Sequence, residues 1–419
     1  MTSKKEKEAF VWIWLPGETE PVVAGRLEAD KGNILFNYGK SYLDRIDADK
    51  PAIAIYEPEL PLQAGVLPLP EGLTMPGCIR DAAPDAWGRR VIINKTLGLK
   101  GQGTDTAELN ELTYLLESGS DRIGALDFQR SPTEYVPRAA GNVSLEELIE
   151  SAQRVEKGVP LTPELDQALF HASSIGGARP KALIQDQGKT YVAKFSSATD
   201  LYSVVKAEFV AMRLAESAGL NVAPVKLVKA ANKDVLLIER FDRAPKDDGW
   251  ARKAMVSPLT LLRLDEMMAR YASYETLAEI IRHRFTDPRH TLKEMFSRLV
   301  FNILCGNTDD HARNHAAFWD GKTLTLTPAY DICPQGRTGN EASQAMLISG
   351  NNNLSRLTTC LETAHNFLLS GEEARAIFAR LTDAIEQNWD AVCEEAELNE
   401  ADKNFLWRRQ FLNPYSIEQ

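Results

Sequence analysis

The sequence predicts an α+β fold with three successive parts: a β-rich N-terminal module, a small α+β lobe and a mostly helical C-terminal lobe. Short β-branched and aromatic runs fill residues 1–130, strand and helix patterns alternate over residues 143–243, and helical periodicity dominates residues 244–419. Residues 131–142, SPTEYVPRAAGN, are polar and hold two prolines and one glycine, which is typical of a linker. A chain of 419 residues is long enough for two or three domains, in agreement with this division.

Extended segments dominate the first 70 residues. The run Val11–Leu15 is β-branched and aromatic and ends at a Pro-Gly pair. The turn Asp30-Lys31-Gly32 separates two further runs and predicts a hairpin. The later extended runs are residues 22–27, 33–38 and 52–56, and the helical segments that follow them are residues 84–90 and 106–116.

The α+β lobe begins with a helix that has a capping box at Ser144 and Glu147. Two strands surround the turn Asp186-Gln187-Gly188, and the next helix ends at Gly219. The expected elements are strands at residues 183–184, 190–195 and 235–239 and a helix at residues 204–217. Helical periodicity then prevails and is broken by the polar residues 307–314 and by a strand-like run at residues 323–327.

The composition excludes two broad classes of protein. An apolar fraction of 44% is sufficient to build packed cores, so the chain is not intrinsically disordered. The chain has 48 Lys and Arg residues and 59 Asp and Glu residues, so its formal net charge is −11. A protein whose main task is to grip a nucleic-acid backbone usually has the opposite balance, so we do not expect one here.

The cysteines and the N-terminus indicate a cellular compartment. The five cysteines are scattered without a Cys-x-x-Cys pair, which favours a reduced, intracellular chain over a disulfide scaffold or a zinc module. The apolar run Ala9–Leu15 follows basic residues, but it is short for a signal peptide and no small-residue cleavage site comes after it. No stretch approaches the roughly 20 apolar residues of a membrane helix. We therefore expect a soluble, cytoplasmic protein without membrane contact.

The densest polar cluster is Asn307–Asn314, directly after an apolar helix. Asp309 and Asn314 are five residues apart, the interval between the Asp and the Asn of a protein-kinase catalytic loop. In that chemistry the Asp orients or deprotonates the attacking hydroxyl, and the Asn binds magnesium. Asp331, seventeen residues after Asn314, is a second acid for such a metal site. The alternative is structural: Asp309 and Asp310 cap a helix, and Asp331 lies in a turn.

A small-residue loop, Ser173–Lys181 (SSIGGARPK), leads into a strand. Its adjacent glycines, Gly176 and Gly177, allow backbone N–H groups to approach a phosphate closely. The loop is not a Walker A motif, and an ordinary turn is the alternative.

Two strands offer further nucleotide-binding groups. Lys194 lies on the strand Tyr191–Phe195, YVAKF, which resembles the kinase strand whose lysine contacts the α- and β-phosphates. Glu208, on the helix that follows, is placed to pair with this lysine; the alternative is a solvated lysine. Glu239–Arg243 ends another strand where a kinase hinge offers backbone groups to adenine, and Asp242 is placed to accept from ribose hydroxyls. The alternative there is a strand end with surface charges and one core Phe.

Other chemistries lack their motifs. The six histidines include no His-Glu-x-x-His, and no Gly-x-Ser-x-Gly elbow occurs, which argues against a zinc hydrolase and an esterase. The groups that are present follow one order: Gly-rich loop, strand lysine, helix glutamate, hinge-like strand end, Asp-x4-Asn and a final Asp. This is the order of parts in a protein kinase.

With these motifs the sequence resembles the HipA-like serine/threonine kinases of bacterial toxin–antitoxin systems. The resemblance covers nearly the whole chain and implies a two-lobed, protein-kinase-like fold, with residues 1–130 as the N-terminal module, 143–243 as the nucleotide-binding lobe and 244–419 as the lobe that holds the catalytic loop and metal site. The motifs that carry it are residues 84–90 (PDAWGRR), 121–126 (DRIGAL), 174–181 (SIGGARPK), 239–243 (ERFDR), 307–314 (NTDDHARN) and 328–331 (PAYD).

The resemblance implies roles for particular residues. Asp309 is expected to be the catalytic base, Asn314 and Asp331 to hold Mg²⁺, and Lys194 to contact the ATP phosphates. Ser174 is expected to be the loop serine that is autophosphorylated, which ejects the loop and stops ATP binding; Ser173 stays an alternative. The other residues implied for ATP binding are Ile175, Gly176, Gly177, Ala178, Lys181, Glu239 and Phe241 (both lining adenine through their backbone), Asp242 (at the ribose), His311 and Arg313.

The resemblance also implies a function. The expected activity is transfer of the γ-phosphate of ATP to a protein, by family analogy a translation factor such as an aminoacyl-tRNA synthetase, with growth arrest as the outcome. The expected partner is a HipB-like helix-turn-helix antitoxin, through which alone the protein would reach DNA. Two alternatives stay open: a pseudokinase that binds nucleotide or a partner without transfer, and a kinase of small molecules.

Overall fold

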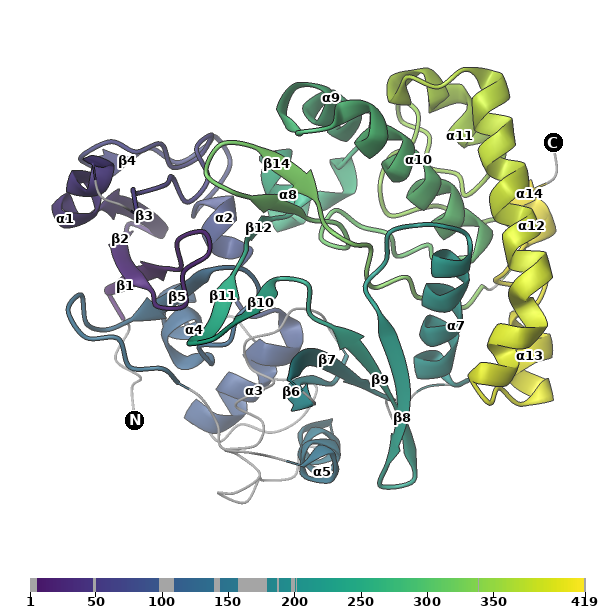
Figure 1. The fold of residues 1–419 in the computed structure, drawn as a ribbon, viewed down its shortest axis with the longest axis horizontal. Coiled ribbons are helices and arrows are strands. Elements are labelled where there is room, and N and C mark those ends of the chain that lie inside the picture. Colours follow the sequence, from purple (N-terminus) through teal and green to yellow (C-terminus); the bar gives the residue numbers. More distant parts are fainter. Residues whose placement is uncertain are drawn as a thin grey trace. The chain divides into compact units, whose positions relative to one another are not determined.

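The computed structural model describes residues 6–47, 50–97, 109–138, 144–156, 179–186, 188–196, 200, 202–337 and 339–417. Strands are concentrated in the purple and teal parts of the chain and helices in its green and yellow parts (Figure 1). The chain divides into two compact units: unit 1 holds residues 1–198, 229–256 and 319–322, and unit 2 holds residues 199–228, 257–318 and 323–419. The predicted segments 1–130 and 143–243 therefore share unit 1, apart from residues 199–228.

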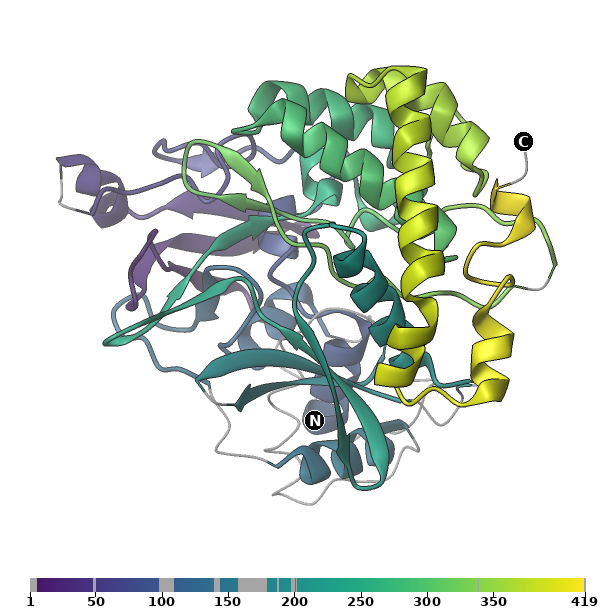
Figure 2. The same ribbon diagram turned by 45° about the vertical axis from the view of Figure 1, so that its right-hand side comes forward.

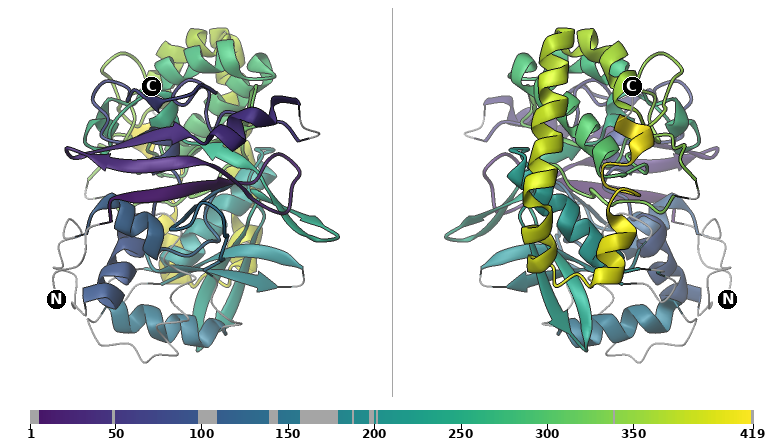
Figure 3. Two further views of the ribbon diagram at one scale, coloured as in Figure 1. Left: turned by 90° about the vertical axis from the view of Figure 1, so that its left-hand side faces the viewer. Right: turned by 90° about the vertical axis from the view of Figure 1, so that its right-hand side faces the viewer.

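A five-stranded antiparallel sheet with the order β4-β3-β2-β1-β5 forms the base of the N-terminal module. Its strands are β1 (Glu8–Ile13), β2 (Val22–Asp30), β3 (Asn33–Tyr38), β4 (Val66–Leu67) and β5 (Leu126–Gln129), of which the first three are the purple arrows in Figure 3. The predicted hairpin is confirmed, because Asp30 pairs with Asn33. Lys31 and Gly32 between them have φ angles of 48° and 90°, as a tight two-residue turn requires.

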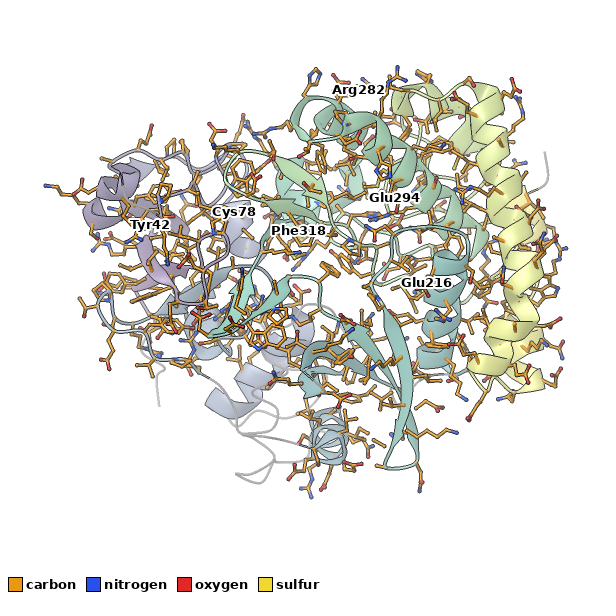
Figure 4. All side chains as sticks on the ribbon, viewed as in Figure 1. Tyr42, Cys78, Glu216, Arg282, Glu294 and Phe318 are labelled. Atoms are coloured by element: carbon orange, nitrogen blue, oxygen red, sulfur yellow. The ribbon has the colours of Figure 1, made fainter. Side chains whose placement is uncertain are left out.

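Residues 52–56 do not form the predicted strand, because tyrosine hydroxyls take the place of a neighbouring strand. The hydroxyl of Tyr42, labelled in Figure 4, donates to the carbonyl oxygen of Ile53 (2.8 Å). The hydroxyl of Tyr38 accepts from the backbone N–H of Ile55 (2.9 Å). Since these bonds satisfy the buried backbone, the segment stays irregular.

The second sheet of unit 1 contains β6 (Lys181–Asp186), β7 (Lys189–Phe195) and β9 (Lys233–Glu239), paired antiparallel in that order. The helix α5 (Leu145–Glu156) begins at the predicted capping box, where the backbone N–H of Ser144 donates to Glu147 (2.9 Å). In α3 (Ala86–Leu97), the indole N–H of Trp87 donates to the carbonyl oxygen of Lys181 (3.2 Å). The PDAWGRR motif thus anchors the N-terminal module on β6.

The remaining elements of unit 1 are short: α1 (Lys40–Leu43), η1 (Asp44–Asp47), α2 (Gly77–Arg80), α4 (Glu111–Glu117), β10 (Arg243–Lys246), β11 (Gly249–Arg252) and β12 (Ala254–Val256). The strand β8 (Val225–Ala230) runs from the residues of unit 2 into those of unit 1. The described part of the predicted linker, residues 131–138, is irregular but packed, because the ring of Tyr135 lies 5.4 Å from that of Trp12 and Arg138 pairs with Asp127 (2.7 Å). Residues 139–142 lie outside the described residues.

A buried ionic network joins the DRIGAL and ERFDR motifs within unit 1. Arg240 donates to both carboxylate oxygens of Asp242 (2.9 and 2.8 Å) and to Asp121 (2.9 Å). Arg243 donates to the same two carboxylates, at 2.9 Å to Asp242 and 2.7 Å to Asp121. The backbone N–H of Gly124 completes the shell of Asp242 at 2.8 Å. Because protein donors occupy both of its oxygens and its exposure is 2%, Asp242 fits a structural role and not the expected contact with a ribose.

Unit 2 is mostly helical. Its elements are α7 (Val204–Ser217), α8 (Pro258–Leu261), η4 (Glu266–Tyr271), α9 (Tyr274–Arg284), α10 (Pro288–Leu304), β14 (Leu324–Leu326), α11 (Leu357–Thr363), η5 (Ala364–Phe367), α12 (Gly371–Glu395), α13 (Glu400–Leu406) and α14 (Pro414–Ile417). The strand β13 (Ala317–Trp319) begins among the residues of unit 2 and ends at Trp319 of unit 1. The predicted helix 204–217 is confirmed as α7, and α7 and α10 both contact the long yellow-green helix α12 in Figure 2. Among the helices of the described residues, none combines the length and the apolar character that crossing a bilayer requires.

The network predicts a large effect of Asp242→Asn on stability. The substitution leaves Arg240 and Arg243 buried with one carboxylate fewer, and breaking a buried ion pair in this way costs about 3–5 kcal/mol. We expect the free energy of unfolding, measured by urea denaturation, to fall by that amount. Asp383→Asn on the exposed face of α12 is the matched control and should stay within about 0.5 kcal/mol of wild type. A loss of similar size in both variants would contradict the network's role.

The same carboxylate predicts a pH dependence. Burial opposes the charge of Asp242, but the guanidinium groups of Arg240 and Arg243 outweigh it and lower the pKa of Asp242. A carboxylate whose pKa is lower in the folded state stabilises the fold at pH values above the pKa of the unfolded state, which is about 3.9. This contribution disappears as the pH falls toward the pKa of the folded state. The difference in unfolding free energy between wild type and Asp242→Asn should therefore be widest near neutral pH and narrow below about pH 4. A difference in unfolding free energy that grows as the pH falls would contradict this prediction.

Candidate active site

The predicted polar loop follows α10 directly and turns at Gly306. This glycine has a φ of 71°, and a Cβ atom on it would lie 2.7 Å from the carbonyl oxygen of Gln410, so no other residue fits. The carbonyl oxygen of Gly306 accepts from the backbone N–H groups of Thr308 (3.1 Å) and Gln335 (3.0 Å). The glycine therefore determines the direction in which the loop leaves the helix.

The adjacent acids Asp309 and Asp310 lie in opposite environments. Asp309 is exposed, whereas Asp310 is 1% exposed. The residues after them form turns until β13 begins, so the alternative that these acids cap a helix is excluded. Of the two, Asp309 is the acid that a substrate can reach.

Asn314 is held against the start of the loop. Its Nδ2–H group donates to the backbone carbonyl of Asp309 (2.9 Å), which also accepts from the backbone N–H of His311 (2.9 Å). The backbone N–H of Asn314 donates in turn to the carbonyl of His311 (2.9 Å). Because Nδ2 is engaged within the loop, Oδ1 is the side-chain atom of Asn314 that is left to bind a cation.

Asp331 is brought to this loop by its neighbours. The hydroxyl of Tyr330 donates to the carbonyl of Arg313 (3.0 Å), and the side-chain amide of Asn307 donates to the carbonyl of Asp331 (3.5 Å). Asp331 has a φ of 59°, in the left-handed region that few residues other than glycine adopt. Such strained backbone is concentrated at functional sites, where the surrounding structure holds it in place.

The carboxylates of the loop influence one another. Burial raises the pKa of Asp309, the imidazole of His311 lowers it, and the charges of Asp331 and Asp310 raise it again, so that the net pKa lies above the ordinary value. A raised pKa makes Asp309 a better proton acceptor than an ordinary surface aspartate.

The donor set of this loop fits Mg²⁺. The amide oxygen of Asn314 and the carboxylate of Asp331 are hard oxygen ligands of the type that Mg²⁺ prefers. Mg²⁺ is commonly bound by one or two protein groups and takes its remaining ligands from phosphate oxygens and water. The arrangement therefore has the chemistry for a cation that is shared with a bound phosphate.

Two lysines face each other in unit 1. Lys181 on β6 and Lys194 on β7 are direct cross-strand partners, and each is 7% exposed. Directly opposite residues of antiparallel strands share a face, with Cβ atoms about 4.5–5.5 Å apart. Two long cationic side chains that start from one face of the sheet suit an anionic ligand such as a polyphosphate.

Other predicted residues have local partners. The carboxylate of Glu239 pairs with Lys189 (2.7 Å), so its backbone is the part left for adenine. Arg313 pairs with Glu266 (2.9 Å), and its backbone N–H donates to Nδ1 of His311 (3.2 Å). The pairing of Glu208 with Lys194 stays a prediction, because Glu208 belongs to unit 2 and Lys194 to unit 1.

Ser173, Ser174, Ile175, Gly176, Gly177 and Ala178 lie outside the described residues. Their roles in nucleotide binding and autophosphorylation stay predictions.

Sequence reasoning missed the residues that assemble the site. Tyr330 and Asn307 link the loop to Asp331, but neither stands at an interval that indicates a contact. Gly306 did carry a signal, since a glycine directly after an apolar helix is typical of a left-handed turn.

Two family models match the chain: the HipA N-terminal domain over residues 14–129 and the HipA-like C-terminal domain over residues 173–389. The protein Y4mE of Sinorhizobium fredii, which is named as a kinase, is 25% identical over 347 residues that cover 76% of each chain. The serine/threonine-protein kinase toxin HipA of Shewanella oneidensis is 24% identical over 266 residues, 57% of this chain and 60% of that protein. HipA in the solved complex of Shewanella oneidensis HipA, HipB and operator DNA has a TM-score of 0.68 and 20% identity over 95% of both chains. These matches confirm the resemblance and the two-lobed, kinase-like α+β fold.

The geometry of Gly306 predicts the effect of Gly306→Ala. Alanine in the left-handed region costs about 1–2 kcal/mol, and its Cβ atom would also collide with the backbone of Gln410. We expect the free energy of unfolding to fall by at least that amount in urea denaturation. Gly336→Ala is the matched control in the same unit, because Gly336 has no positive φ and a Cβ atom on it would meet no heavy atom within 4 Å. Equal stability of the two variants would contradict this account.

Proposed function

This chain belongs to the HipA family, and from that membership we propose that it is an ATP- and Mg²⁺-dependent serine/threonine protein kinase. The observation that carries the proposal is the loop in unit 2 where Asn314 donates to the backbone of the exposed Asp309, and where Asn307 of the same loop donates to the backbone of Asp331. One exposed acid with a raised pKa beside an amide and a second carboxylate is the set of groups that phosphoryl transfer to a hydroxyl requires.

In the proposed reaction, Asp309 accepts the proton of the attacking hydroxyl. The hydroxyl oxygen forms a bond to the γ-phosphorus, and the bond between that phosphorus and the bridging oxygen of ADP breaks. Asn314 and Asp331 would hold Mg²⁺, which when bound neutralises charge on the β- and γ-phosphate oxygens. The hydrogen bond from Asn314 to the backbone of Asp309 couples the orientation of ligand and base (2.9 Å). The protein then contributes mainly by positioning and charge.

We assign the binding of ATP to the residues that the family resemblance implies. Lys181 and Lys194 would contact the phosphates, and their cross-strand position supports this assignment. Glu239 and Phe241 would line adenine through their backbone, and His311, Arg313 and the loop Ser174–Ala178 would complete the nucleotide contacts. Asp242 is not part of the proposed site, because Arg240, Arg243 and Gly124 already occupy its oxygens.

The proposed substrate is a protein, by family analogy a translation factor such as an aminoacyl-tRNA synthetase, and phosphorylation would arrest growth. Ser174 is the proposed autophosphorylation site, with Ser173 as its alternative. The proposed partner is a HipB-like helix-turn-helix antitoxin, supported by the relative solved with HipB and operator DNA. The protein would reach DNA only through that partner, in the cytoplasm.

The central prediction concerns Asp309→Asn. Removal of the proton acceptor should reduce the transfer of radiolabel from [γ-³²P]ATP to protein by about 10²–10⁴-fold. ATP binding should change little, because asparagine keeps the shape of the side chain. Asp383→Asn, far from the loop in sequence and exposed on α12, should transfer label at the wild-type rate.

The same assay separates the alternatives. Label on Ser174 or on a lysate protein, lost in Asp309→Asn, supports the protein kinase. Wild-type protein that binds ATP and labels no protein would overturn it: label on a small molecule would then indicate a small-molecule kinase, and no label at all a pseudokinase. Ser174→Ala should abolish autophosphorylation while phosphorylation of the other protein persists.

A further inference from the structure

Three polar side chains are buried together behind the catalytic loop of unit 2. Tyr274, Asp310 and His315 are 0%, 1% and 3% exposed. The Nε2 atom of His315 lies 2.8 Å from Oδ1 of Asp310 and 3.1 Å from the hydroxyl of Tyr274. That hydroxyl also donates to Oδ2 of Asp310. We call this group of three residues the loop clasp.

The clasp acts on the loop because of where its members lie in the chain. Asp310 directly follows Asp309, and His315 directly follows Asn314. The contact between Asp310 and His315 therefore joins the two ends of the segment that carries the proposed base and the proposed metal ligand. Asn314 also donates to the backbone of Asp309 (2.9 Å), which is a second contact between the two ends of the same segment.

Tyr274 connects the clasp to the rigid part of unit 2. It lies at the first position of α9, and its backbone N–H donates to the carbonyl of Leu347 (2.9 Å). Its ring stands edge-on to that of His315, with centroids 5.9 Å apart. A displacement of the loop relative to α9 would therefore break contacts at the clasp.

The clasp holds a charge in the core. Burial raises the pKa of Asp310, but the neighbouring imidazole of His315 and the hydrogen bonds from Tyr274 and Asn302 outweigh burial, so the net pKa is lowered. A buried charged group with its polar partners is often no more stabilising than apolar residues of similar volume. Its directional bonds give what apolar packing lacks, a fixed orientation for the residues next to it.

We propose that Tyr274, Asp310 and His315 are positioning residues that hold Asp309 and Asn314 in the geometry for Mg²⁺ binding and phosphoryl transfer. The inference rests on the proposed kinase function of the same loop. None of the three side chains touches ATP in this proposal; each acts through the residue beside it. Partners that orient metal ligands from behind typically change metal affinity or activity by about 10–100-fold when they are removed.

The test compares Tyr274→Phe with wild type at one fixed pH, using the full chain. The half-saturating Mn²⁺ concentration is measured by electron paramagnetic resonance in the presence of a non-hydrolysable ATP analogue, and kcat and the KM for ATP are measured by radiolabel transfer. We expect the Mn²⁺ value to rise by about 10-fold or more and kcat to fall by about 10–100-fold. Tyr271→Phe removes an exposed tyrosine hydroxyl from η4 and should match wild type in all three values.

A second pair of variants separates positioning from stability. His315→Gln keeps an N–H donor near the position of Nε2, whereas His315→Leu keeps only volume. We expect the glutamine variant to recover most of the Mn²⁺ affinity that the leucine variant loses. Equal loss in both, or wild-type Mn²⁺ affinity in a folded Tyr274→Phe, overturns the clasp. If the wild-type protein transfers no phosphate, the proposed kinase function is wrong. The Mn²⁺ affinities then still test whether the loop clasp positions the metal ligand.

Discussion

The structure of unit 1 depends on keeping a few buried charges paired. Arg240 and Arg243 lie at the end of β9 and the start of β10, and the carboxylates of Asp242 and Asp121 compensate them there. An isolated charge in such a place would cost several kcal/mol of desolvation, so the segment that carries Asp121 must stay packed on the strand end. The N-terminal module is therefore joined to the sheet that contains β6, β7 and β9 by the need to pair these charges, in addition to the hydrogen bond from Trp87 to β6.

The need to give buried charges polar partners also explains why Asp309 and Asp310 differ in the proposed catalytic loop of unit 2. Asp309 and Asp310 are identical in chemistry and adjacent in the chain, yet one is exposed and the other is enclosed by donors from Tyr274 and His315. Because the buried Asp310 needs polar partners, its contacts hold the backbone of the loop in place. The exposed Asp309 stays accessible for the proposed proton transfer. A pair of adjacent carboxylates thus separates the structural task from the chemical one.

The sequence could predict what depends on neighbours along the chain. The hairpin at Lys31-Gly32, the capping box at Ser144 and the helix 204–217 follow from local turn, cap and periodicity signals, and all three are confirmed. It could not predict residues whose partners are distant. Asp242 was expected at a ribose because its neighbours along the strand suggest a hinge, but the groups that enclose it include Gly124, 118 positions earlier. The prediction of a strand at residues 52–56 is wrong for the same reason, because the tyrosines that bond to their backbone come from another segment.

The family motifs therefore differ in what they report. ERFDR and DRIGAL bind each other in the core of unit 1, and their presence in a chain indicates the fold. In NTDDHARN the second Asp is buried support, whereas Asp309 and Asn314, together with Asp331, are the residues to which we assign the proposed phosphoryl transfer. A relative that kept Asp310, His315 and Tyr274 but lost Asp309 would retain the same loop and the same overall similarity. Similarity of fold is thus expected to survive loss of activity, and on the proposed mechanism the presence of Asp309 is the feature that separates a kinase from a pseudokinase.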